Sequence, residues 1–124
     1  MNGELQLVII ISEKNLADRI VSSIFAHASM PFVVRGKGTA PNSVIEALGL
    51  GEPEKDIVFC FASKKEVPKI YSILSKKFRF IKNKKGIAFA IPLSAVGGSL
   101  TMDLMLKNSK KIIRSLTDKE KNNE

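Results

Sequence analysis

Two glycine-containing motifs combine residue types that suit the binding of a phosphate or another small anion. The first comprises Gly36, Lys37, Gly38 and Thr39, and the second comprises Lys84, Lys85 and Gly86. Glycines let the backbone approach a ligand closely, lysines supply positive charge, and the threonine hydroxyl can form a hydrogen bond. Neither motif is a Walker loop. Both are also compatible with plain structural roles, as a loop hinge and as a solvated basic turn.

The residues that usually form catalytic or metal centres are scarce. The chain has one cysteine, Cys60, and one histidine, His27, so an intrachain disulfide and a His-rich metal site are both excluded within one chain. Cys60 lies between two phenylalanines in an apolar run, which favours a packed, unreactive thiol over a nucleophile. We therefore expect no catalytic residue and no metal site.

The positive charge of the chain is concentrated in one segment. The formal net charge is +8, and residues 64–85 hold nine Lys and Arg residues against the single acid Glu66. Such a segment indicates an anionic partner or a solvated basic face. The alternative function is therefore a basic module that uses residues 64–85 to bind nucleic acid or an acidic partner. Nucleic acid is the less favoured partner, because only Phe78 and Phe80 offer rings for base stacking.

Composition indicates one globular domain. Of the 124 residues, 44% are apolar and 26% are charged, which excludes extensive disorder. No apolar run is long enough to span a membrane, and the run at 7–11 is too short for the core of a signal peptide. We expect a cytoplasmic protein that reaches a membrane only through a partner.

Hydrophobic periodicity predicts four strands and two helices. The strands are expected at 5–11, 32–34, 57–61 and 86–93, and the helices at 12–27 and 63–74. Ser12 is expected to cap the first helix, and Ser63 and Glu66 have the spacing of a capping box at the second. Pro31 is expected to lie in the connection before the second strand. The run at 57–61 is apolar on both faces, which indicates a central strand.

This order of elements predicts an α+β fold of the ferredoxin-like βαββαβ type. It has a four-stranded antiparallel sheet with two helices on one face, plus a C-terminal helix. The expected divisions are a ferredoxin-like domain at 1–98, an appended amphipathic helix at 99–116 and a polar, disordered tail at 117–124. Glycines and prolines mark a long loop between the second and third strands. The uncovered face of the sheet suggests an oligomer.

Three blocks of sequence resemble the nitrogen-regulatory P-II-like (PII-like) signalling proteins. The blocks lie at 36–40, 48–56 and 86–92, in the order and spacing of that family, and the resemblance covers roughly residues 4–98. It implies a ferredoxin-like homotrimer whose sheets face inward, with effector sites in the clefts between subunits. It also implies that the protein regulates a target enzyme or transporter and does not catalyse a reaction.

The resemblance also assigns an effector site. Gly36 and Gly38 match glycines at the base of the T-loop, Asp56 falls where the family usually has a glutamate, and Gly86 matches a glycine of the phosphate-binding B-loop. Lys37, Thr39, Lys84 and Lys85 are added to the predicted site because they supply charge and a hydroxyl. The implied effector is an adenine nucleotide (ATP, ADP or AMP), no cofactor is required, and the loop 38–53 carries the signal in nitrogen or related metabolic regulation.

Three departures from the classical pattern indicate a divergent member of that family. The loop is shorter than in classical members and holds no tyrosine. Ile87 stands where a lysine is expected, and Ser94, Ala95 and Val96 stand where a pair of arginines is expected. A shortened T-loop and a different or weaker ligand follow from these departures.

Overall fold

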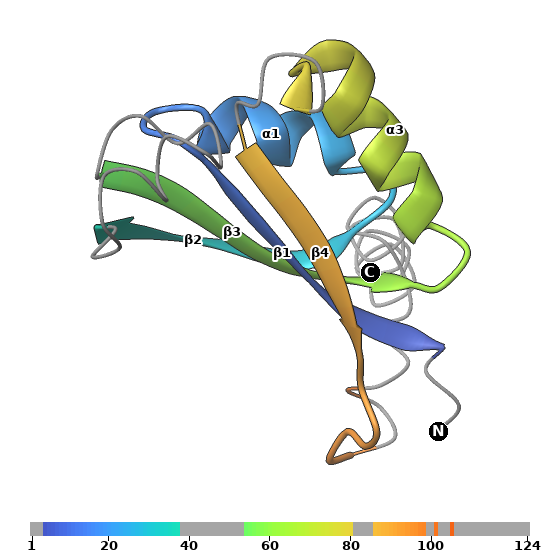
Figure 1. Cartoon of the computed structure of the whole chain (residues 1–124). Helices are drawn as coiled ribbons and strands as arrows, with labels where there is room; N and C mark the ends of the chain where they lie inside the picture. The colour runs from blue at the N-terminus through green and yellow to red at the C-terminus, as the bar shows by residue number, and fades with distance from the viewer. Residues whose placement is uncertain (1–3, 38–53, 81–85, 99–100, 102–104, 106–124) are drawn as a thin grey trace, which may run out of the picture.

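The computed structural model describes residues 4–37, 54–80, 86–98, 101 and 105. The elements in chain order are β1 (Leu5–Glu13), α1 (Ala17–Ile24), β2 (Ser29–Lys37), β3 (Glu54–Ser63), α3 (Val67–Lys77) and β4 (Gly86–Pro92). The strands form one antiparallel sheet in the order β2-β3-β1-β4, and both helices lie on the same face of it (Figure 1). The predicted ferredoxin-like fold and the central place of the third strand are confirmed. The loop 38–53, the tail 117–124 and all but two residues of the helix expected at 99–116 lie outside the described residues.

One face of the sheet packs against the two helices to form the core. Alternate residues of the central strands meet the apolar side of each helix, and these buried residues include Val8, Ile10, Val58, Cys60, Ile20, Ile24, Ile70 and Leu74. The two-residue period of the strands and the three-to-four-residue period of the helices place these side chains on facing surfaces. At the start of β2, the Ser29 hydroxyl donates a hydrogen bond to the carbonyl oxygen of Met105 at 2.7 Å, so this point of the C-terminal region lies against the sheet.

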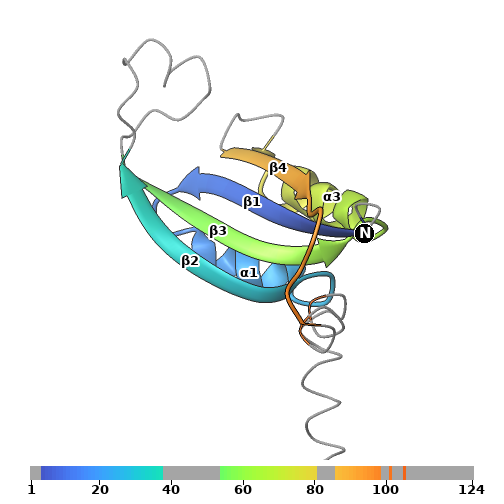
Figure 2. The same cartoon turned by 90° about the horizontal axis from the view of Figure 1, so that it is seen from below.

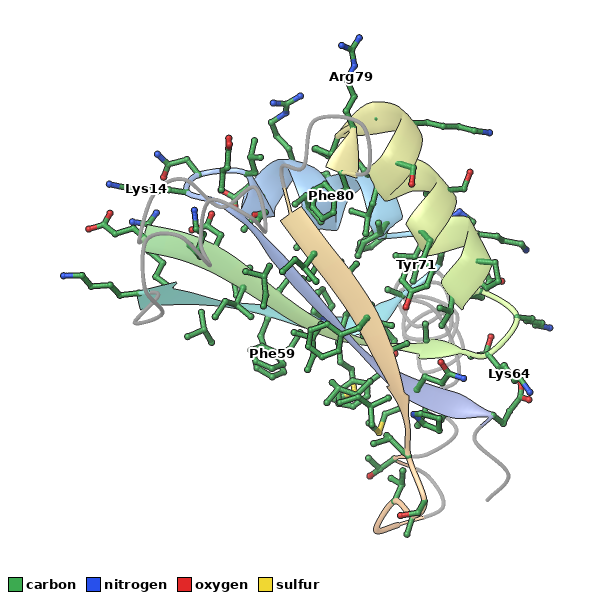
Figure 3. The ribbon with its side chains drawn as sticks, in the orientation of Figure 1. Lys14, Phe59, Lys64, Tyr71, Arg79 and Phe80 are labelled. Carbon is green, nitrogen blue, oxygen red and sulfur yellow. The ribbon has the colours of Figure 1, made fainter. Side chains whose placement is uncertain are left out.

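The opposite face of the sheet carries apolar side chains that remain accessible in the described structure. Phe32 and Val34 of β2 and Phe89 and Ile91 of β4 are between 39% and 52% exposed. The Phe32 ring stacks on Phe59 with centroids 5.1 Å apart, and Phe59 points away from the helices (Figure 3). Contiguous apolar surface of this kind is typical of an interaction site. The expected oligomer remains a prediction.

Strand β2 is longer than the predicted 32–34. It includes Pro31, which was expected in the connection, and its register against β3 shifts between Ser29 and Phe32. Because β2 is an edge strand, the missing N–H of a proline need not break the ladder there. Gly36 also belongs to this strand and not to the loop.

Both predicted helix starts are wrong. Ser12 lies in β1, paired with Asp56 on one side and with Gly86 on the other, and α1 begins only at Ala17. The α3 helix begins at Val67 without a side-chain cap. Strand pairing continues to the end of β1 and thereby overrides the local capping signal.

Glu66, expected in a capping box, instead links the two helices. Its Oε2 lies 2.7 Å from Nδ1 of His27, beyond the end of α1, and its Oε1 lies 3.5 Å from the Lys69 ammonium. Burial raises the Glu66 pKa, but the hydrogen bond with His27 and the positive charge of Lys69 together outweigh burial. The pKa of Glu66 therefore lies below its ordinary value.

We expect Glu66 to make part of the free energy of unfolding depend on pH. A carboxyl group whose pKa is lower in the folded state stabilises the protein fully above its unfolded pKa of 4.5, and this contribution is lost as the pH falls through the folded value. Glu66→Gln should therefore lower the free energy of unfolding at neutral pH, and the difference from wild type should shrink below pH 4.5. Urea unfolding at several pH values measures this, with the exposed Glu4→Gln as control. A difference independent of pH would contradict the assignment.

Candidate functional site

A cavity of about 410 Å³ lies at the end of the sheet where β1 and β2 finish and β3 begins. Its walls are formed by Lys14, Arg35, Gly36, Lys37, Glu54, Lys55 and Asp56. Four of these residues are cationic and two are acidic, so the lining carries an excess of positive charge. Figure 3 shows Lys14 at this end of the sheet and Lys64 at the opposite end. A cavity with this charge excess suits an anion.

The antiparallel register brings the lining residues together from separate parts of the chain. Three pairs between β2 and β3 stand side by side at the cavity: Arg35 with Asp56, Gly36 with Lys55, and Lys37 with Glu54. Lys14 reaches the same place from the other side, because it directly follows the last residue of β1. The site therefore depends on the ends of three strands meeting at one end of the sheet.

Both acids of the cavity are matched to cations. The Lys14 ammonium lies 2.9 Å from Oε2 of Glu54, and this hydrogen bond and charge lower the Glu54 pKa. Nε of Arg35 lies 3.8 Å from Oδ1 of Asp56, which is beyond hydrogen-bond distance, and Nη2 of Arg35 donates to Oδ1 of Asn15 at 3.4 Å. The Arg35 guanidinium is thus held only by long contacts and is mostly exposed.

Asp56 connects the cavity to the first helix. Its side chain is almost fully buried, and Oδ2 accepts a hydrogen bond of 3.2 Å from the backbone N–H of Ala17, the first residue of α1. A carboxylate here satisfies a helix N–H that has no partner within the helix, and it also complements the helix dipole. Asp56 thus supplies the cap that was expected from Ser12. Its Oδ1 has no hydrogen-bond partner in the part of the chain that the structure describes.

The structure brings together three of the predicted site residues. Gly36, Lys37 and Asp56 line the cavity. Gly86 begins β4 at the same end of the sheet, but β4 and β2 form opposite edges of that sheet (Figure 2). The remaining four predicted residues, Gly38, Thr39, Lys84 and Lys85, lie outside the described residues.

Gly86 has a packing role that the sequence analysis did not consider. A Cβ atom at this position would lie 2.6 Å from both the Ile11 carbonyl oxygen and Cζ of Phe80. Gly86 lines a second cavity of about 320 Å³, together with Tyr71, Leu74, Ser75, Phe80 and Ala88. The glycine is therefore needed for close packing at the start of β4, and its contact with a phosphate remains a prediction.

Sequence reasoning missed four lining residues: Lys14, Arg35, Glu54 and Lys55. Two of them adjoin predicted site residues, since Arg35 precedes Gly36 and Lys55 precedes Asp56. A usable signal was the gathering of charged residues at the ends of predicted strands. Which strand ends meet depends on the sheet order, so this signal identifies the site only once the topology is known.

The basic segment at 64–85 has exposed cationic side chains where the structure describes it. Its lysines and arginine lie on the surface, namely Lys64, Lys65, Lys69, Lys76, Lys77 and Arg79. Phe78 and Phe80 are instead buried, at 7% and 6% exposure, and the Arg19 guanidinium lies over the Phe78 ring at 5.6 Å. Neither ring is therefore available for base stacking, which adds to the argument against nucleic acid as the partner.

Other potential reactive centres are absent from the described ranges. Cys60 is fully buried, and burial raises its pKa to about 12. These ranges hold no group of three or more His, Cys, Asp or Glu residues placed to bind a metal ion. They also contain no helix that is both long and apolar enough to cross a membrane.

Comparison with known proteins supports the fold. No family model and no curated protein matches the chain. A divalent cation tolerance protein from Thermus thermophilus superimposes with a TM-score of 0.63 at 14% identity, over 85% of this chain and 98% of that one. A PII-like signaling protein from the same organism superimposes with a TM-score of 0.52 at 18% identity, over 70% of this chain and 84% of that one. CPII from Thiomonas intermedia, bound to ADP, AMP and acetate, superimposes with a TM-score of 0.52 at 16% identity, over 73% of this chain and 89% of that one. The chain therefore has the ferredoxin-like fold that these proteins share.

We expect Asp56→Ala to lower the free energy of unfolding by about 1–2 kcal/mol, because it leaves the N–H of Ala17 without an acceptor. Asp56→Asn keeps an acceptor oxygen and should retain most of the stability. Denaturant unfolding measures both variants, and Asp18→Ala, which removes an exposed acid from the first turn of α1, is the control. Equal losses for Asn and Ala would contradict a capping role.

Proposed function

We propose that the protein is a PII-like regulatory protein, and not an enzyme, that binds a small anionic effector and signals its bound state to a target enzyme or transporter. The observation that carries this proposal is the cationic cavity at the end of β2. Lys37 lies in the cavity wall as the last residue of β2, and the loop 38–53 follows it directly in the chain. A ligand in the cavity therefore contacts the base of the loop.

Signalling then follows from a shift between two states of the loop. A ligand moves such an equilibrium only by the difference between its affinities for the two states, and a difference of about 1.4 kcal/mol changes the ratio tenfold. An anion that draws Arg35 and Lys37 toward itself makes contacts that depend on the path of the chain after Lys37. The cavity thus provides the differential contact that the mechanism needs.

The proposed effector is an adenine nucleotide, and the proposed setting is nitrogen or related metabolic regulation. CPII, one of the structural neighbours, was solved with ADP and AMP. The cavity of about 410 Å³ is within the usual range for small-molecule sites. Lys84 and Lys85 precede β4 and would add charge for the phosphates.

We further propose that the site is completed in a homotrimer. Because β2 and β4 are opposite edges of one sheet, the motifs at Gly36 and Gly86 can share a cleft only when the β2 edge of one chain meets the β4 edge of another. The apolar face around Phe32 and Ile91 gives a reason to assemble, since burial stabilises by about 25 cal/mol per Å² of apolar area. The partner on this face is therefore a second and a third copy of the chain.

Native mass spectrometry should give a species of three times the 13.6 kDa chain mass. Phe32→Lys combined with Ile91→Lys places two charges on the apolar face and should shift the protein toward monomer. Ser22→Lys, at an exposed position of α1, is the control and should leave the oligomeric mass unchanged. A wild-type monomer at micromolar concentration would rule out the trimer.

A thermal-shift panel with ATP, ADP, AMP, cyclic nucleotides and bicarbonate, with and without magnesium, tests the effector. A ligand at 100 times its dissociation constant adds about 2.7 kcal/mol to stability, which gives a measurable rise in melting temperature. Lys84→Ala with Lys85→Ala should reduce the nucleotide response without unfolding the protein, whereas Lys76→Ala with Lys77→Ala should not. A flat panel would contradict the nucleotide proposal, and a selective response to Cu²⁺ or Zn²⁺ in the same assay would favour cation tolerance.

A further inference from the structure

The cavity between α3 and β4 differs in chemistry from the cationic cavity at the end of β2. Its volume is about 320 Å³, and none of the described residues that line it is charged. These residues are Tyr71, Leu74 and Ser75 of α3, Gly86 and Ala88 of β4, and Phe80. In Figure 3, Tyr71 projects from α3 toward β4, and Phe80 lies near the start of β4. Such a lining suits an uncharged ligand, because a charged group would lose its water without gaining a counter-charge.

The cavity exists because β4 places short side chains on the side of the sheet that faces the helices. Gly86 pairs with Ser12 and Ala88 pairs with Ile10, and both partners are fully buried beneath the helices. Directly opposed residues of two strands share a face, so Gly86 and Ala88 also face α3. The larger Ile87 between them points to the opposite face. The space beside α3 therefore follows from the alternation of small and large residues in β4.

Two aromatic rings line this space, and one of them is fixed by its neighbours. Phe80 is only 6% exposed, its ring meets the edge of the Phe78 ring with centroids 6.5 Å apart, and its Cζ would lie 2.6 Å from a Cβ atom at Gly86. Leu74, which is 2% exposed, forms the buried part of the wall. Aromatic side chains prefer another ring in an offset-stacked or edge-to-face arrangement. The walls therefore favour a planar ring as the ligand.

Two hydroxyl groups supply polar contacts at the same cavity. Tyr71 and Ser75 are four residues apart in α3, so their side chains lie on the same side of the helix. Burial raises the pKa of Tyr71 above its ordinary value, so its hydroxyl stays protonated at neutral pH and can donate a hydrogen bond. A few polar groups in an apolar cavity fix the orientation of a ligand. The expected ligand thus carries a hydrogen-bonding atom on its ring.

We propose that the cavity between α3 and β4 binds a small, uncharged heteroaromatic compound of one or two rings. Its ring lies against Tyr71 and Phe80, and its ring nitrogen or oxygen forms a hydrogen bond with the hydroxyl of Tyr71 or Ser75. A volume of about 320 Å³ is at the lower end of the range for small-molecule sites, which limits the ligand to this size. The inference goes beyond the proposed function and depends neither on the anionic effector nor on the trimer.

The test uses Tyr71 as the reporter, because it is the only tyrosine of the chain. In protein labelled with ¹³C-tyrosine, every tyrosine ring signal in an NMR spectrum comes from this cavity. The probes are indole and quinoline, which are uncharged bicyclic heteroaromatics with a donor and an acceptor nitrogen respectively. At least one of them should shift the Tyr71 signals saturably. Benzoate, which is charged, and cyclohexanol, which is not planar, should not.

Ser75→Leu fills the cavity, and Ser72→Leu is the matched control, because it makes the same change at an exposed position of α3. Ser75→Leu should weaken binding of the better probe at least tenfold, and Ser72→Leu should leave it unchanged. Without ligand, Ser75→Leu should melt no lower than Ser72→Leu, because the added side chain occupies empty space. Tyr71→Phe keeps the ring and loses the hydroxyl, so ligand-observed NMR should show binding about fivefold weaker if Tyr71 forms the hydrogen bond.

Three results would overturn the inference. Tyr71 signals that respond to neither probe would show that the cavity binds no such ring. A Ser75→Leu protein that melts well below Ser72→Leu would show that the chain itself already fills the space. Equal responses to indole, benzoate and cyclohexanol would show that the cavity does not select a planar, uncharged ring. The proposed function is tested separately, because its ADP response should persist in Ser75→Leu, and a flat nucleotide panel would leave the probe results unchanged.

Discussion

The antiparallel pairing of β1 with β3 determines where most of the charged side chains near the cavity lie and which face of the sheet they point to. Nine consecutive residue pairs join these strands, from Leu5 with Ser63 to Glu13 with Lys55. This register extends β1 beyond the point where a helix was expected and sets Ser12 beside Asp56. A shift by one residue would turn Asp56 away from α1 and would expose the apolar residues that now face the helices.

The cavity follows from that register because charged residues gather where the strands end. A sheet interior must be apolar, so charged side chains occur where β1 and β2 finish and β3 begins. Two of them, Lys55 and Asp56, are nevertheless buried, and each retains an atom without a hydrogen-bond partner among the described residues. Natural cores rarely leave such atoms unmatched, and when they do the position is often functional.

The helices cover one face of the sheet and leave the other face apolar and exposed. The fold of βαββαβ proteins places both crossings on the same side, so the second face must be covered by something else or remain in water. Phe32, Val34, Phe89 and Ile91 show that this face is not adapted to water. The same topology separates the two glycine motifs onto opposite edges of the sheet. In the proposed site, the two motifs therefore meet only when chains assemble.

The sequence by itself determined the element order, the α+β class and the central third strand. These properties depend on hydrophobic periodicity and on spacing, which are local. Only the tertiary structure decided where α1 begins, because its cap comes from Asp56, 39 residues from Ala17 in the chain. It also decided that Lys55 is buried and that Phe78 and Phe80 belong to the core, because burial depends on which strand and helix lie beside a residue. Neighbours brought together by long-range strand pairing leave no periodic signal in the sequence.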